Sequence, residues 1–103
     1  MYKEGDILVF YNDWRAEYCI FILHRIYNDD WIEAHAKYSL PFKKLGVGAN
    51  NASTNVKYST GCLRKAYEDE REFLLEKMKE KGYSYDFKKN KLLHLFNYEK
   101  ERN

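Results

Sequence analysis

Residues 63–93, LRKAYEDEREFLLEKMKEKGYSYDFKKNKLL, decide the fold of the C-terminal third of this chain. Acidic residues crowd the start of an expected helix near Tyr67, and lysines crowd its end, which suits the dipole of a helix. Gly82 follows the last lysine, where a residue of left-handed conformation ends a helix. Tyr67, Leu74 and Met78 recur at helical spacing, so they are predicted to form the buried stripe.

A β-hairpin is predicted directly after this helix. Tyr83 and Tyr85 alternate as strand residues do, residues 88–90 have the composition of a turn, and residues 91–95 return as a second strand. Residues 63–96 are therefore expected to form one unit of helix, strand, turn and strand.

The unit also carries a recognisable pattern: Arg64-x-Ala66, an acidic run through Glu70, Leu74, Met78, Gly82-Tyr83 and Asp86. It resembles the C-terminal unit of a loose family of small, mostly uncharacterised proteins of gut bacteria, found often in their prophages and mobile elements. Tyr67 stands where that family usually has a capping threonine, so the helix start is expected to shift by up to a turn. The resemblance implies an SH3-like, β-rich N-terminal part and a phage or mobile-element accessory protein. It transfers no functional residues.

Residues 1–62 are predicted to form a β-meander. A turn at residues 3–6 leads into an apolar strand at 7–11, and the following strand, 18–26, is apolar on both faces. A strand without a polar face is usually covered on both sides, and the helix is the expected cover of one side.

The strand at residues 31–38 shows clear alternation instead. Its predicted inward residues are Ile32, Ala34, Ala36 and Tyr38, and its predicted outward residues are Glu33, His35 and Lys37. On this interpretation His35 is a surface residue, and His24 is a hydrogen-bonded residue of the sheet.

The predicted fold class is therefore α+β: a small antiparallel, SH3-like β-sheet or partial barrel with one main helix and a C-terminal β-hairpin. One domain is expected across residues 1–103, with a tail at 97–103. Residues 45–54, LGVGANNAST, are a predicted loop, with a flexible connection, a protein contact and a phosphate cradle as its alternatives. No lysine–serine pair completes a P-loop there.

Composition and spacing argue against several classes of function. No apolar run has the length of a membrane span and no signal peptide opens the chain, so a cytoplasmic protein without membrane contact is expected. No catalytic dyad or nucleophile elbow is recognisable, so neither an enzyme nor a cofactor is predicted. Cys19 and Cys62 are expected to be reduced. A metal site built from them with His24, His35 and His94 has no supporting spacing, and no metal is predicted.

The favoured function is a non-enzymatic protein-binding module. Phe73 lies more than a right angle away from the predicted buried stripe, and Glu72, Glu76 and Glu80 flank it. This composition is typical of an apolar anchor with a charged rim, although contact of Phe73 with another part of the same fold is the alternative. The partner is expected to be a bacterial protein or a second copy of the chain. A phage-derived inhibitor of a bacterial defence protein is the sharpest form of this hypothesis.

The alternative function is nucleic-acid binding by a small β-barrel protein. Its predicted residues combine positive charge with rings that could stack on bases, namely Lys88, Lys89, Lys91, Tyr83 and Tyr85. The net charge of only +2 and the glutamates at four-residue intervals along the helix count against this alternative.

Overall fold

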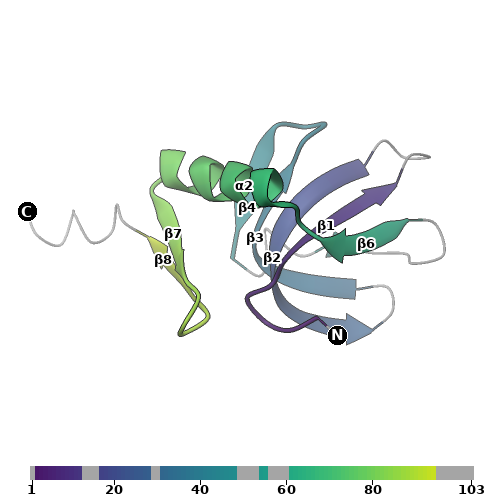
Figure 1. Cartoon of the computed structure of the whole chain (residues 1–103), viewed down its shortest axis with the longest axis horizontal. Helices are drawn as coiled ribbons and strands as arrows, with labels where there is room; N and C mark the ends of the chain where they lie inside the picture. The colour runs from purple at the N-terminus through teal and green to yellow at the C-terminus, as the bar shows by residue number, and fades with distance from the viewer. Residues whose placement is uncertain (1, 13–16, 29–30, 49–53, 56–60, 95–103) are drawn as a thin grey trace, which may run out of the picture.

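The computed structural model describes residues 2–12, 17–28, 31–48, 54–55 and 61–94 (Figure 1). In chain order the elements are β1 (Ile7–Asn12), β2 (Glu17–Asn28), β3 (Trp31–Ser39), β4 (Lys44–Val47), β5 (Thr54–Asn55), β6 (Cys62–Lys65), α2 (Glu68–Glu80), β7 (Tyr83–Asp86) and β8 (Lys91–His94). This order confirms the predicted α+β class with one main helix and a C-terminal hairpin. The predicted tail lies outside the described residues.

Antiparallel pairing joins the main sheet in the order β4-β3-β2-β1-β6, and β5 pairs with the start of β3. The strands described here do not close into a barrel. Two predicted boundaries were wrong. The predicted loop begins too early, because residues 45–47 belong to β4. The predicted helix–hairpin unit also begins inside the sheet, because β6 pairs with β1 before the chain enters α2.

Three irregularities interrupt the pairing of β2 with β3, and two of them lie next to each other at the bend of the sheet. The third passes over Tyr27 near the end of β2. His35 on β3 and His24 on β2 are each an extra residue that faces no Cα partner in the other strand. Such bulges bend strands and redirect side chains. Figure 1 shows β2 and β3 turning sharply between their two ends. The pairs on either side of the two bulges are Ile22–Ala36, Leu23–Ala34 and Arg25–Glu33.

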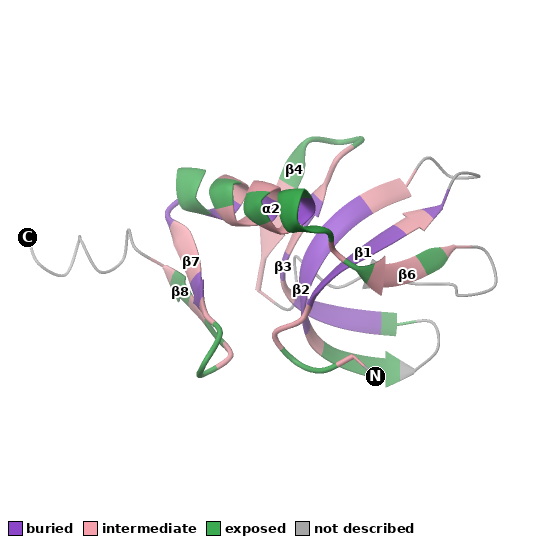
Figure 2. Ribbon diagram, in the orientation of Figure 1, coloured by how far each residue is buried: buried purple, intermediate pink, exposed green. Residues whose placement is uncertain are grey.

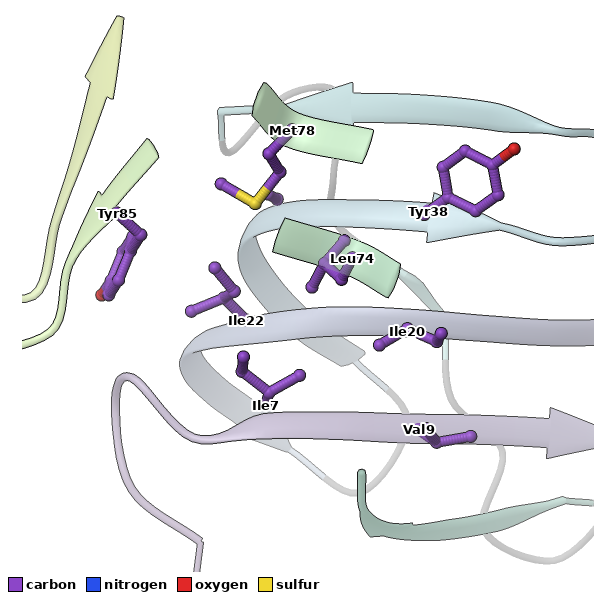
Figure 3. Packing of buried hydrophobic residues seen from close by; sticks show 9 residues of the cluster. Ile7, Val9, Ile20, Ile22, Tyr38, Leu74, Met78 and Tyr85 are labelled. Carbon is purple, nitrogen blue, oxygen red and sulfur yellow. The ribbon is translucent and has the colours of Figure 1, made fainter. Parts of the chain in front are cut away.

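Apolar clusters cover both faces of the sheet, as the two-sided strand at 18–26 predicted. The first cluster joins the sheet to α2 and β7 and consists of Ile7, Val9, Ile20, Ile22, Ala36, Tyr38, Leu74, Met78 and Tyr85 (Figure 3). The second lies on the other face and consists of Leu8, Phe10, Cys19, Phe21, Leu23, Ile32 and Ala34. The alternating residues of β3 are all buried as predicted, but the bulge at His35 divides them between the two clusters.

The helix packs on the first cluster through Leu74 and Met78, which are fully buried and confirm most of the predicted stripe. The prediction was wrong for the third residue of the stripe, because Tyr67 is exposed. Tyr67 is the N-cap residue and has an extended backbone, so the periodicity of the helix does not apply to it. Glu70 takes its place on the buried side, four residues before Leu74.

The Glu70 carboxylate holds the start of α2 against the sheet. Both terminal nitrogens of Arg64 on β6 donate to it, at 2.7 Å and 2.9 Å, and the hydroxyl of Tyr18 on β2 donates to Oε2. The backbone N–H of Tyr67 donates to Oε1 at 2.7 Å, which is one half of a capping box. The bonds from Arg64 and Tyr18 lower the pKa of Glu70 to about 2, although burial alone would raise it.

The described residues contain no helix that is both long enough and apolar enough to cross a bilayer.

Truncation of Leu74 to alanine tests the packing of α2. Because Leu74 is fully buried between helix and sheet, Leu74→Ala should lower the free energy of unfolding by about 2–5 kcal/mol in a urea titration. Leu93→Ala on β8 is the matched control, since Leu93 is exposed and its truncation should change stability by about 0.5 kcal/mol or less. Equal losses in the two variants would contradict this packing.

The stability of the fold should fall in acid because of Glu70. Its folded-state pKa of about 2 lies below the ordinary 4.5. The ionised carboxylate therefore stabilises the fold above pH 4.5, on the order of 3 kcal/mol, and this contribution is lost as the pH falls from about 4.5 towards 2. Glu70→Gln should lower stability at pH 7 and flatten this part of the pH profile, measured by denaturant unfolding at each pH. Glu72→Gln, on the exposed side of α2, should keep the wild-type profile; an unchanged profile in Glu70→Gln would refute the assignment.

Candidate functional site

The outer end of the β2–β3 pair presents large side chains to solvent. Tyr27 is 51% exposed, Trp31 is 39% exposed and Ile26 is 41% exposed. Figure 2 shows exposed residues on both strands at this end, next to the N-terminus. We call this surface the hairpin end and define it by Arg25, Ile26, Tyr27, Trp31 and Glu33.

Four of these residues share one face of the strand pair. The guanidinium carbon of Arg25 lies 4.3 Å from the centroid of the Tyr27 ring, and its Nε donates to Oε2 of Glu33 at 3.1 Å. Arg25 also donates to the hydroxyl of Tyr27. Trp31 precedes Glu33 by two residues on β3, so it lies on the same side of the sheet. Hydrogen bonds from Tyr27 and Arg25 lower the pKa of Glu33 and keep its charge opposite that of Arg25.

A second polar group lies at the bend of the sheet. Oε2 of Glu4 is 2.7 Å from Nδ1 of His24 and 2.8 Å from Nε2 of His35. The centroids of the two imidazole rings are 4.5 Å apart. We call these three residues the histidine cluster. Hydrogen bonds to His35 and His24 lower the pKa of Glu4.

Glu4 reaches the histidines from a turn that is bonded to β2. The N–H of Gly5 donates to the carbonyl of Leu23 at 2.9 Å, and the N–H of Leu23 donates to the carbonyl of Asp6 at 2.9 Å. Gly5 has a φ of +93°, and a Cβ at this position would lie 2.4 Å from Oδ1 of Asn90. Only glycine fits both the turn and this close approach to the C-terminal hairpin.

The predicted anchor on the helix, Phe73, is half-buried rather than fully exposed. Its ring makes an edge-to-face contact with Tyr38, with centroids 5.1 Å apart, and it packs against the first cluster. Contact with the same fold, the alternative interpretation, is therefore what the structure shows. The sheet extends beyond the central stripe of α2, so a side chain on the flank of the helix still meets Tyr38. Glu72, Glu76 and Glu80 are exposed, and Glu80 lies 3.4 Å from Nζ of Lys77.

The structure excludes one of the predicted nucleic-acid residues, Tyr85, from the surface. Lys88, Lys89 and Lys91 are exposed around the β7–β8 turn, but Tyr85 is buried in the first cluster. The Tyr85 ring lies 4.9 Å from that of His35, and burial raises its pKa to about 12. Tyr83 is half-buried and stacks on His94 with centroids 4.4 Å apart. Tyr85 is therefore removed from the candidate nucleic-acid surface.

The cysteine and histidine residues considered as metal ligands separate in the structure. Cys19 is buried, which raises the pKa of its thiol to about 11, whereas Cys62 is exposed on β6. His94 lies against Tyr83 on the hairpin. Only His24 and His35 come together, and Glu4 joins them.

Neither group was predicted from the sequence. Regular alternation placed His35 outward and treated His24 as an ordinary sheet residue, because a bulge changes the register without a clear mark in the sequence. Glu4 was read only as part of a turn. For the hairpin end, the sequence did contain a signal: two large rings, Tyr27 and Trp31, stand close together near the expected turn between two strands, where exposed apolar surface is informative.

Comparison with protein-family models, with curated proteins and with solved structures gave no match. The likeness to small proteins of gut bacteria and their prophages therefore stays a prediction.

Truncation of Phe73 should now affect stability. Phe73→Ala removes a half-buried ring from Tyr38 and should lower the free energy of unfolding by about 1–3 kcal/mol in a urea titration. Phe42→Ala is the control, because Phe42 is 79% exposed and its loss should cost about 0.5 kcal/mol or less. Wild-type stability of Phe73→Ala would restore the interpretation of Phe73 as a free anchor.

Proposed function

We propose that this protein is a binding module that engages another protein through the hairpin end. The observation that supports this proposal is the exposure of Tyr27 and Trp31 at one end of the β2–β3 pair, with the Arg25 guanidinium over the Tyr27 ring. Tryptophan, tyrosine and arginine are the residues that most often dominate the energy of protein interfaces. Their rings lose little conformational entropy on binding and combine an apolar body with a polar edge.

A protein partner suits this surface better than nucleic acid does. Arg25 is the cation at the hairpin end, and Glu33 lies 3.1 Å from it, so the pair adds no net positive charge for a phosphate backbone. A partner with an apolar recess and a few hydrogen-bonding groups at its rim would complement these residues.

The identity of the partner rests on the resemblance of residues 63–93 to proteins of prophages and mobile elements. An accessory protein from such an element acts on the bacterial cell that carries it, so a bacterial protein is the proposed partner. Inhibition of a defence protein by occupying its surface is the specific form of this proposal. It requires no chemistry from the module itself.

Paired variants of the hairpin end test the proposal. Tyr27→Ala and Trp31→Ala should each weaken binding of a purified bacterial partner by about thirtyfold or more, measured by calorimetry, while thermal stability changes little. Candidate partners are the proteins that the wild type retains from a bacterial lysate, and each is purified before the variants are compared. Phe42→Ala is the matched control, because it removes a more exposed ring at the β3–β4 turn.

Three outcomes would overturn this assignment. Loss of binding in Glu76→Lys but not in Trp31→Ala would place the interface on α2. Sedimentation of the wild type as a dimer that Trp31→Ala dissociates would make a second copy the partner. A mobility shift with DNA or RNA at low salt that charge reversal at Lys88 and Lys89 abolishes would favour nucleic acid.

A further inference from the structure

We propose that the histidine cluster, Glu4, His24 and His35, is a binding site for a divalent transition-metal ion such as Zn²⁺. This site is distinct from the hairpin end, and its existence does not depend on the proposed function. The ligating atoms of its three residues all lie within 4.8 Å of one another.

The donor set selects the class of metal. Two imidazole nitrogens and one carboxylate oxygen suit Zn²⁺ and the neighbouring first-row ions, whereas Ca²⁺ and Mg²⁺ prefer sites made of oxygen alone. Three protein ligands leave at least one coordination position for water, as in sites that keep an open position. The same donors are unsuited to Cu⁺, which prefers thiolate and thioether.

The distances from Glu4 to the two histidines are slightly shorter than those of a zinc site, and the two histidine nitrogens lie within 4.8 Å of each other. Ligands of a tetrahedral zinc ion at ~2.0–2.1 Å from the metal lie roughly 3.3 Å from each other. Oε2 of Glu4 now lies 2.7 Å and 2.8 Å from the two histidine nitrogens, so it would need to withdraw by about half an ångström. Glu4 sits on an exposed turn, and rotation of its side chain can supply this movement.

Two bulges in the β2–β3 pair bring the two histidines to the same place. Each is the extra residue of a bulge, and the two bulges lie on facing strands. The Tyr85 ring, 4.9 Å from His35, supports the imidazole from the side of the C-terminal hairpin. Bulges are common next to functional sites because they redirect a side chain without disrupting the strands on either side.

Access to the site is open on the side of Glu4. The side chains of His24 and Glu4 are 38% and 37% exposed, and a surface recess of about 380 Å³ adjoins Glu4. A hydrated ion can therefore reach the carboxylate without any opening of the sheet.

Titration of the full chain with Zn²⁺ and with Co²⁺ tests the site. The background is Cys62→Ser, because an exposed thiol binds these metals on its own. We expect one ion per chain by calorimetry, and visible absorption of Co²⁺ characteristic of low coordination number. Glu4→Gln, His24→Gln and His35→Gln should each weaken binding by about tenfold or more. His94→Gln, which changes the histidine on the hairpin, should bind as the background does.

Glu4→Gln keeps the proposal testable if a histidine variant fails to fold, since Glu4 lies on an exposed turn. A rise in melting temperature on addition of Zn²⁺ that is absent in Glu4→Gln would support the site. Failure of the background protein to bind either ion, or equal weakening by His94→Gln, would overturn it. The three residues would then be only a hydrogen-bonded contact between the turn and the sheet.

Discussion

The buried Glu70 carboxylate is the interaction on which the arrangement of this protein depends. It receives hydrogen bonds from β2, from β6 and from the N-cap of α2, so one side chain fixes three parts of the chain relative to each other. A buried carboxylate is costly unless such donors satisfy it. Leu74 and Met78 follow Glu70 on the same side of the helix and fill the apolar cluster below. The polar network therefore sets the orientation of α2, and apolar burial supplies most of its stability.

The bend of the central strand pair is the second constraint. At this bend the buried residues of β3 divide between two apolar clusters, and these clusters cover the two faces of the sheet. The same bulges bring His24 and His35 together, where regular pairing would leave them as ordinary members of two strands. The same bulges thus determine both the division of the apolar core and the position of the histidine cluster.

The sequence predicted the parts of this fold that depend on local chemistry. The charges at the two ends of α2, the stop at Gly82 and the turn of the hairpin follow from helix dipoles and backbone conformation. Two-sided burial of β2 followed from its apolar composition. The sequence did not predict the bulges, because a change of register between β2 and β3 leaves no clear mark in the composition of either strand. The burial of Glu70 was not predicted either, because Arg64 and Tyr18, which bind its carboxylate, lie on other elements.

The hairpin end and the histidine cluster are neighbours along the same strand, since Arg25 directly follows His24. Beyond the bend, the direction of β2 is set by its pairing with β3 and by the contact of His24 with Glu4. A binding surface that is already ordered loses less entropy when its partner arrives, so affinity rises without any new contact. The histidine cluster and the proposed recognition surface therefore occupy adjacent positions on one short segment of β2.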